Sequence, residues 1–193
     1  MKASNSVKQQ YFNMNILLLA FYHPRYMVPL NQWGNLLGQR GWNVTQMYPD
    51  TYYKEDIITE FSKDYDVIVY FGHGVPGAWC GYRFIRIKDF EQIKSIKNNL
   101  GVMSLSCYSL SNKRGKSLGE VLINSSLAEY VIGYEDRIKY KENLELLNHI
   151  FTILFNYDNY NLINDLQSII NNFRNTSVKI LFSSSLNKCN IIN

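Results

Sequence analysis

The sequence is poor in features that support disulfides, metal sites or membrane spans. Its three cysteines, Cys80, Cys107 and Cys189, are odd in number and show no CxxC spacing. This argues against a disulfide framework and a structural zinc site, and favours a reducing compartment. The apolar stretch NILLLAFY is too short to cross a bilayer, and no small-residue cleavage site follows it. We therefore expect a cytoplasmic protein with no membrane partner, no metal and no other cofactor.

Long runs of like charge are also absent. The 20 basic and 16 acidic residues give a net charge of +4 and are spread along the chain. A mild excess of this kind usually reflects a soluble basic surface, so we do not expect a nucleic-acid partner. With 193 residues, of which 46% are hydrophobic and 15% aromatic, the chain can bury the core of one ordinary domain.

Strand-like and helix-like segments alternate along the chain. Apolar or alternating runs predict strands at 14–22, 42–48, 66–72, 101–106, 129–134 and 178–184. Helical spacing and capping residues predict helices near 29–40, 55–62, 89–97, 117–125, 141–155 and 162–173, and WCGYRFIRI predicts a hairpin. This order predicts one α/β domain, a three-layer flavodoxin-like sandwich with a mainly parallel sheet of about six strands. We place it at 14–185, between a flexible leader (1–13) and a tail (186–193).

Three reactive side chains, His23, His73 and Cys107, follow predicted strands directly. In open parallel sheets the ligand crevice lies beyond the carboxyl ends of the strands. The strands before His73 and Cys107 are neighbours in the commonest doubly wound order, with axes about 4.8 Å apart. We therefore expect a thiol and an imidazole to meet at this edge, which is a nucleophile and base arrangement.

A purely structural interpretation competes with this one. A lone histidine near a strand end is usually a hydrogen-bonded structural residue, and a cysteine in an apolar strand is usually a small buried hydrophobe. The flanking residues favour function. Gly72 and Gly74 bracket His73 and let the backbone turn sharply or approach a ligand. Cys107 borders the polar loop YSLSNKRGK, which favours an exposed sulfur.

The same residues carry a family resemblance. The run YDVIVYFGHGVPGAW, then GVMSLSCYS, a polar loop and SLGEVLINSSLAEYVIGY, resembles the caspase-like cysteine peptidase clan, above all its gingipain-like and CHAT-domain members. The mark of that clan is a His-Gly pair ending one strand and a cysteine ending the next. The resemblance implies a caspase-like fold and a cysteine endopeptidase acting on proteins or peptides. It assigns Cys107 as nucleophile, His73 as general base and acid, and the amides of Gly74 and Cys107 as the oxyanion hole.

Two departures from the family pattern keep other functions open. Ser109 stands where many members have a glycine, and Tyr108 is bulkier than the usual neighbour of the cysteine. They put the width of the cleft in question and leave a catalytically inactive module that binds or regulates a protein partner as an alternative. A flavodoxin-like small-molecule binder is a third possibility, favoured if Cys107 is inaccessible.

The resemblance gives two conflicting indications of substrate specificity. In several clan members an acidic residue just after the strand that follows the nucleophile lines a pocket for a basic side chain, which here implies Asp136 and Glu135 in GYEDRI. Caspases instead hold an aspartate with an arginine, a role that YHPRY offers to Arg25, with His23 beside it. We expect cleavage after a basic residue, with Asp136 ahead of Glu135.

Overall fold

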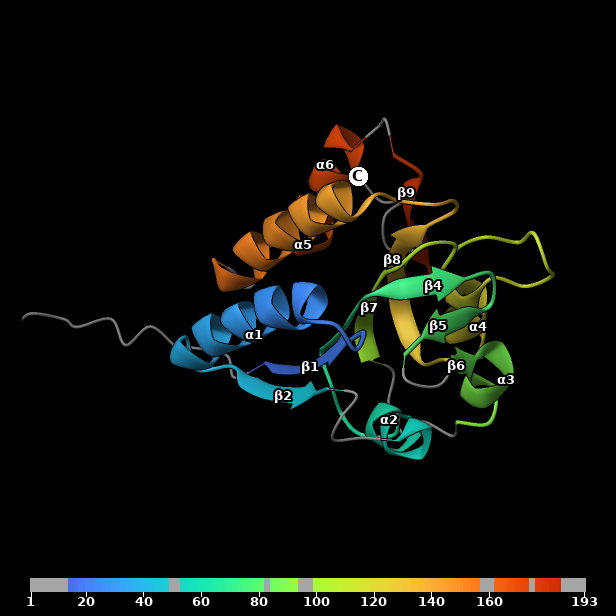
Figure 1. Ribbon diagram of the computed structural model, residues 1–193, viewed down its shortest axis with the longest axis horizontal. Coiled ribbons are helices and arrows are strands. Elements are labelled where there is room, and N and C mark those ends of the chain that lie inside the picture. The colour runs from blue at the N-terminus through green and yellow to red at the C-terminus, as the bar shows by residue number, and fades with distance from the viewer. Residues whose placement is uncertain are drawn as a thin grey trace, which may run out of the picture.

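The computed structural model describes residues 14–48, 53–81, 84–93, 99–156, 162–173 and 176–184. The expected leader (1–13) and tail (186–193) lie outside these described residues. A six-stranded sheet of order β2-β1-β3-β7-β8-β9 forms the centre of the protein (Figure 1). Its strands are β1 (Asn15–Ala20), β2 (Asn43–Met47), β3 (Val67–Phe71), β7 (Asn99–Leu105), β8 (Ala128–Tyr134) and β9 (Val178–Phe182).

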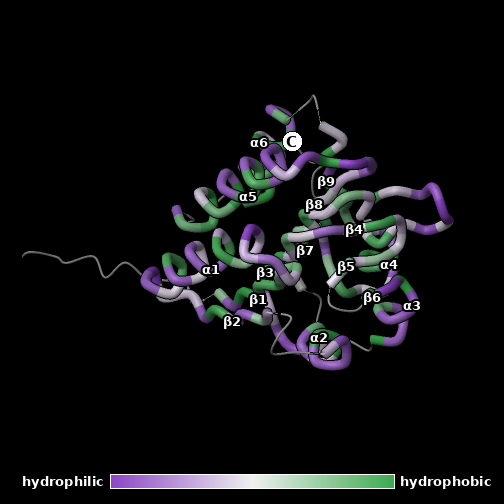
Figure 2. Tube along the Cα trace, viewed as in Figure 1, coloured by the Kyte–Doolittle hydropathy of each residue, from purple (hydrophilic) through white to green (hydrophobic). Residues whose placement is uncertain are grey.

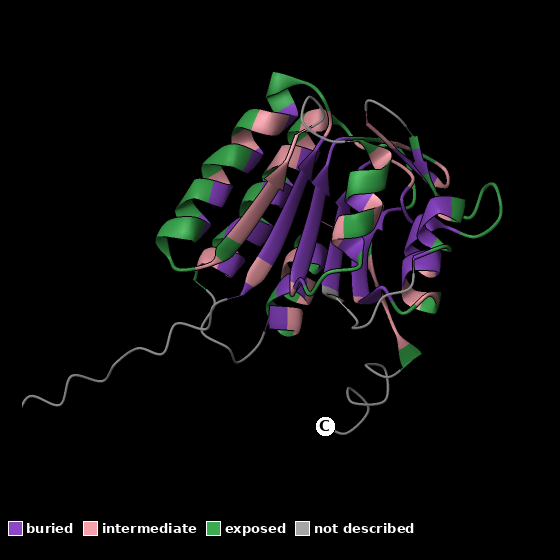
Figure 3. Cartoon of the chain, turned by 90° about the horizontal axis from the view of Figure 1, so that it is seen from below, coloured by how far each residue is buried: buried purple, intermediate pink, exposed green. Residues whose placement is uncertain are grey.

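All neighbouring strands of this sheet are parallel except β8 and β9, which are antiparallel. The prediction of a mainly parallel sheet of about six strands is therefore confirmed. Strands β1, β3 and β8 read as continuous apolar runs because both of their faces are covered. The edge strands β2 and β9 are only partly buried. Figure 3 shows this contrast between buried central strands and partly exposed edges.

Helices cover both faces of the sheet, as a three-layer sandwich requires. Helices α1 (Pro24–Gln39), α5 (Tyr140–Phe155) and α6 (Leu162–Asn172) pack on one face, around a core that includes Ile16 and Leu18. Helices α2 (Lys54–Phe61), α3 (Ile87–Phe90) and α4 (Leu118–Asn124) pack on the other face, with Leu17 and Leu19. Successive β1 side chains thus enter opposite cores. Along α1 and α5 hydrophobic and hydrophilic residues alternate, as in amphipathic helices (Figure 2).

A small antiparallel sheet follows β3 directly. It consists of β4 (His73–Val75), β5 (Ala78–Cys80) and β6 (Phe84–Arg86). The hairpin of β5 and β6 was predicted, whereas β4 was not. The Tyr70 hydroxyl donates to the carbonyls of His73 and Cys80, at 2.8 and 2.7 Å. Trp79 stacks on Tyr70, and its Nε1 donates to Ser104 Oγ at 2.6 Å. These bonds fix the small sheet to the end of the large one, and with it the backbone of His73.

Helix α1 begins five residues before the predicted start at residue 29. Proline is well suited to the first turn, so Pro24 opens the helix, and His23 caps it by accepting the Arg25 N–H at its Nδ1. Pro29 lies inside the helix and has no N–H for the Arg25 carbonyl. The Tyr140 hydroxyl donates to that carbonyl instead, at 2.6 Å, and so joins α5 to α1.

The remaining helices agree with the sequence in part. The predicted capping box of α4 is present, because Ser117 Oγ accepts the Glu120 N–H and the Glu120 carboxylate accepts the Ser117 N–H. The helix predicted at 89–97 is shorter than expected in its described part, since α3 ends at Phe90 and a turn follows; residues 94–98 lie outside the described residues. No helix in the described part of the chain is long and apolar enough to span a membrane.

Candidate active site

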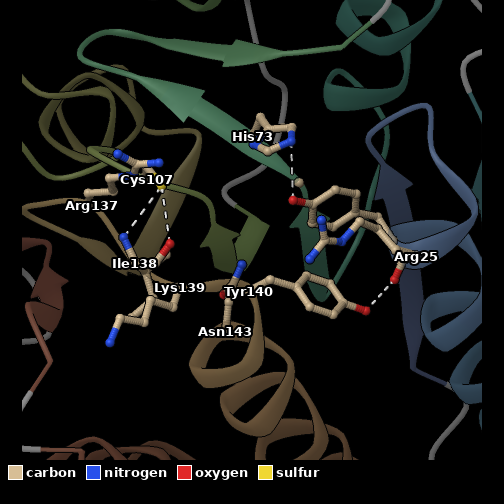
Figure 4. Close-up of a pocket in the computed structure, with 10 residues that line it drawn as sticks. Arg25, His73, Cys107, Arg137, Ile138, Lys139, Tyr140 and Asn143 are labelled. Carbon is tan, nitrogen blue, oxygen red and sulfur yellow. Dashed lines mark hydrogen bonds between the residues drawn. The ribbon is translucent and has the colours of Figure 1, made fainter.

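The parallel register of β3 and β7 brings the His73 and Cys107 segments together. Phe71 pairs with Leu105, and the Gly72 N–H donates to the Leu105 carbonyl at 3.2 Å. His73 and Cys107 each lie two residues beyond that pair. The two strands are therefore neighbours, as the sequence predicts, and the imidazole and the thiol both line one pocket of about 620 Å³ at their carboxyl ends (Figure 4).

The pocket is built from four segments of the chain. They are the first turn of α1, the β3–β4 connection, the turn after β7, and the loop that leads from β8 into α5. The lining residues are Arg25, Tyr26, Gly72, His73, Cys107, Arg137, Ile138, Lys139, Tyr140 and Asn143. All four segments begin at the carboxyl edge of the sheet, which is where open α/β sheets bind their ligands.

Cys107 is half-buried and has a polar backbone neighbour. Its Sγ accepts the Ile138 N–H at 3.4 Å and lies 3.7 Å from the Ile138 carbonyl. The Ile138 peptide thus contacts the sulfur through both its N–H and its carbonyl. The next residue, Tyr108, has φ of 61°, a left-handed conformation that is uncommon outside glycine. This turn sends the chain away from the pocket immediately after the cysteine.

His73 is exposed but is held by two aromatic rings. Its Nε2 hydrogen-bonds with the buried Tyr26 hydroxyl at 3.3 Å, and Phe21 meets the imidazole edge to face at 4.7 Å between centroids. Partial burial lowers the pKa of His73, and the electrostatic influence of Arg25 and His23 lowers it further. The imidazole is therefore kept neutral and able to accept a proton. Among the described residues, His73 and Cys107 bond to Tyr26 and Ile138 and not to each other.

Gly74 packs directly on the Cys107 peptide. A Cβ at this position would lie 2.4 Å from the Cys107 carbonyl oxygen and 2.7 Å from Ser106 Oγ. Both distances are far below van der Waals contact, so only glycine fits without a shift of the backbone. The sequence suggested glycine for close approach to a ligand. In the structure the close approach is to the backbone of the predicted nucleophile.

The two departures from the family pattern lie outside the pocket lining. Ser109 is buried, and its Oγ donates to the Ser104 carbonyl and accepts the Tyr134 N–H, both at 3.1 Å. Its side chain therefore joins β7 to β8 beneath the site. Neither Ser109 nor Tyr108 is among the lining residues, so neither narrows the pocket.

The four residues predicted to bind substrate are separated by the structure. Arg25 lines the pocket, whereas His23 caps α1 and is not among the lining residues. Glu135 and Asp136 also lie outside the lining. Glu135 forms an ion pair with Lys179, and Asp136 forms one with Lys113, each at 2.8 Å. The hydrogen bond from Lys113 lowers the pKa of Asp136. Their roles in substrate binding stay predictions.

Several lining residues were missed from the sequence. Arg137, Lys139 and Tyr140 follow β8 almost as closely as the two acidic residues do, so the strand-end rule could have found them. Asn143 gave no signal, because asparagine inside a helix has no distinctive pattern. It is buried, and its Nδ2 donates to the Leu105 carbonyl at 2.8 Å while its Oδ1 accepts the Tyr134 hydroxyl at 3.0 Å. Asn143 thus holds α5 against the end of β7.

A three-layer α/β sandwich with histidine and cysteine at adjacent strand ends defines the class of caspase-like proteins. Within that class, the family model of Peptidase family C25 matches residues 10–189, so the chain belongs to Peptidase family C25. A comparison with curated proteins gives no match.

Solved structures of this class share the fold at low sequence identity. The Arg-specific cysteine proteinase gingipain R (RgpB) superimposes with a TM-score of 0.69 at 15% identity, covering 93% of this chain and 48% of that one. The complex of Porphyromonas gingivalis RgpB pro- and mature domains gives 0.70 at 15% identity, covering 93% and 49%. The Saccharomyces cerevisiae separase–securin complex gives 0.53 at 14% identity, covering 78% and 10%. The chain spans about half the length of the RgpB chains that it matches.

Proposed function

We propose that this protein is a cysteine peptidase in which Cys107 is the nucleophile and His73 the general base and acid. The observation that carries the proposal is the shared pocket. His73 and Cys107 both line this pocket, each two residues beyond the paired residues Phe71 and Leu105 of β3 and β7. Gly74, next to His73, packs on the Cys107 backbone. Membership of Peptidase family C25 supports the same chemistry.

The groups present support a complete hydrolytic cycle. His73 takes the proton of the Cys107 thiol, and the sulfur attacks the scissile carbonyl carbon. The amides of Gly74 and Cys107 bind the developing oxyanion. His73 then gives its proton to the leaving amine, which breaks the peptide bond and leaves a thioester. In the second half His73 deprotonates a water molecule, which attacks the thioester and releases the acid, and the thiol regains its proton.

Side-by-side alanine variants test this proposal. Cys107→Ala and His73→Ala are expected to abolish hydrolysis of a mixed peptide library while the melting temperature stays nearly constant, since each truncates a half-buried or exposed side chain. Iodoacetamide should label Cys107 much faster than Cys80, because burial raises the pKa of the Cys80 thiol to about 11. The proposal is contradicted if His73→Ala lowers the melting temperature while Cys107→Ala leaves both the melting temperature and peptide hydrolysis as in the wild type.

The catalytically inactive module remains the alternative. It is favoured by one observation, that His73 and Cys107 are engaged with Tyr26 and Ile138 in the described structure. If this alternative holds, iodoacetamide labels Cys107 no faster in the wild type than in His73→Ala, and no peptide is cleaved. The relatives in complex with a pro-domain and with securin support a protein or peptide as ligand in either case.

A cytoplasmic location stays a prediction.

The side chain that precedes the cleaved bond was expected to be basic. The structurally similar gingipain R is an Arg-specific cysteine proteinase, which favours that expectation. The acidic residues on which it depends, Asp136 and Glu135, are paired with lysines outside the pocket lining, and this lends it no support. The charge of the lining itself favours the opposite preference.

A further inference from the structure

The imidazole of His73 needs a support beyond its own strand. His73 opens β4, a strand of three residues, and it is exposed. The bond from the Tyr70 hydroxyl fixes the backbone carbonyl of His73 but not its ring. An exposed ring on a fixed backbone can still turn about its side-chain torsions, and such a turn moves its nitrogens. A general base at this position therefore requires a second group that holds the ring.

Tyr26 supplies that group from the first turn of α1. Its hydroxyl lies 3.3 Å from Nε2 of His73, and the two rings meet edge to face with their centroids 5.2 Å apart. Figure 4 shows this hydrogen bond as the dashed line at His73. Phe21 meets the imidazole edge to face as well, at 4.7 Å. The ring of His73 is thus held by one polar and two aromatic contacts.

Tyr26 is itself firmly placed. It is only 4% exposed, and its backbone N–H donates to the His23 carbonyl at 2.9 Å. Its ring packs edge to face on three others, with centroid distances of 5.1 Å to Phe71, 5.4 Å to Tyr140 and 5.7 Å to Phe21. A ring fixed in this way presents its hydroxyl at one point, so binding the imidazole costs little further side-chain entropy.

The bond to Tyr26 decides which ring nitrogen can serve the thiol. Because Nε2 is engaged with Tyr26, Nδ1 is the nitrogen left for Cys107. A neutral imidazole accepts a proton only at its bare nitrogen, so Nδ1 acts as a base only when the ring hydrogen is on Nε2. In that tautomer Nε2–H donates to the Tyr26 oxygen. The hydroxyl hydrogen of Tyr26 is then left to solvent in the pocket, which Tyr26 lines.

We propose that Tyr26 is a positioning residue, which accepts the Nε2–H of His73 and so directs Nδ1 to the Cys107 thiol. This inference rests on the proposed peptidase function and adds a third residue to its pair. When His73 takes the thiol proton, the bond to Tyr26 becomes stronger, because a charged donor forms the stronger hydrogen bond.

A tyrosine performs this role without a charge of its own. Burial raises the pKa of Tyr26, and the opposing effect of Arg25 is smaller, so the hydroxyl stays uncharged at neutral pH. A carboxylate in the same place would raise the pKa of the imidazole, whereas the pKa of His73 is lowered. Tyr26 therefore orients the base and leaves it neutral.

Tyr26→Phe tests the role, because it removes the hydroxyl and keeps the packed ring. For the peptide of a mixed library that the wild type cleaves best, we expect kcat to fall at least about tenfold, as for loss of a hydrogen bond to a charged group. KM should change less than about twofold, since the hydroxyl acts through His73 and not on the substrate. A Tyr26→Phe variant with wild-type kcat overturns the inference.

Tyr65 offers a matched control. It is 7% exposed, its hydroxyl donates to Glu60, and it belongs to the core on the opposite face of the sheet. Tyr65→Phe thus removes one hydroxyl of a buried tyrosine without touching the pocket. It should keep the kcat and KM of the wild type, even if the melting temperature falls by a few degrees. An equal loss of kcat in both variants identifies a general loss of stability and overturns the inference.

The protonation of the His73 ring provides a measurement that does not depend on hydrolysis. With 15N in the imidazole, nuclear magnetic resonance distinguishes the protonated nitrogen from the bare one. Above the pKa of His73, the hydrogen should be on Nε2. Tyr26→Phe should lower this pKa further, because an acceptor at Nε2 favours the charged ring. A hydrogen on Nδ1, or a pKa that Tyr26→Phe raises, shows that Tyr26 donates to Nε2 and overturns the inference.

The two measurements separate the inference from the proposed function. If the wild type cleaves peptides and Tyr26→Phe keeps its kcat, the positioning role is wrong and the peptidase stands. If the wild type cleaves no peptide, the proposed function fails, and the resonances of His73 alone decide the role of Tyr26. A hydrogen on Nε2 together with a pKa that Tyr26→Phe lowers then supports it, and either opposite result overturns it.

Discussion

Single residues around His73 decide how the candidate site is protonated. The imidazole hydrogen-bonds with the Tyr26 hydroxyl, and no carboxylate is among the groups that shift its pKa. Burial first, and then Arg25 and His23, oppose the imidazolium form of His73, so its proton leaves at a lower pH than from a free histidine. The imidazole of His73 is therefore neutral at neutral pH.

This arrangement predicts the acid limb of the pH profile. Because the pKa of His73 is lowered from 6.5, kcat/KM for a peptide without ionisable side chains should fall only below pH 6.5. Arg25→Gln removes a positive charge that opposes protonation, so the pKa of His73 rises and the acid limb moves to higher pH. Initial rates between pH 4 and 9 provide the measurement, with Arg40→Gln, at the opposite end of α1, as the control.

An acid limb that lies above pH 6.5, or that Arg25→Gln moves to lower pH, contradicts the assigned electrostatics.

The residues of the site differed in how far the sequence revealed them. His73 and Cys107 end strands, and a strand end is recognisable from an apolar run followed by glycine or polar residues. Tyr26 and Asn143 reach the same place from helices, and their contacts join residues 47 and 38 positions apart. Helical periodicity tells which face is buried but not which side chain on that face meets a given strand end. These partners therefore required the structure.

At the scale of secondary-structure elements, strands were predicted better than helix ends. The central strands are continuous apolar runs because both faces of the sheet are covered there. The start of α1, in contrast, depends on Pro24 and on a histidine cap, which no common capping pattern includes. The strand β4 was missed because His73–Val75 has only three residues, two of them exposed. Its position depends on side chains of the large sheet, chiefly Tyr70, and not on its own sequence.

Two glycines, Gly74 at the contact between β4 and the turn after β7 and Gly38 on α1, are expected to respond to alanine in opposite ways. Gly74→Ala places a methyl group 2.4 Å from the Cys107 carbonyl oxygen, so the backbone must shift. We expect a loss of about 1–3 kcal/mol in unfolding free energy, as for other overpacked sites, and loss of hydrolysis. Gly38→Ala adds a methyl group with nothing within 4 Å, on an exposed turn of α1. It should stabilise the protein by about 0.5–1 kcal/mol and keep full activity.

Thermal melts and peptide hydrolysis of the two variants, measured together, check this prediction. A Gly74→Ala variant with wild-type activity and melting temperature shows that the β4 backbone is not held against Cys107.

At the scale of the whole molecule, the described residues form two hydrophobic cores that share one sheet. Leu17 and Leu18 are adjacent in β1 yet belong to different cores, and the same alternation continues in β3. If the strands separate, both cores are exposed to water, because the same hydrogen-bonded strands form one side of each core. The domain expected at 14–185 should therefore unfold as one cooperative unit.

One variant in each core tests this cooperativity. Ile150→Ala opens a cavity in the core beneath α5, and Leu122→Ala opens one beneath α4; both side chains are fully buried. Each should lower the unfolding free energy by about 2–5 kcal/mol and shift one common transition. Leu36→Ala, at a side chain that is 39% exposed on α1, is the control and should change little. The transition is followed by circular dichroism and by alkylation of Cys80, which adjoins Trp79 of the second core in β5. If Ile150→Ala melts part of the helical signal while Cys80 stays protected, the two cores unfold separately and the single-domain prediction is wrong.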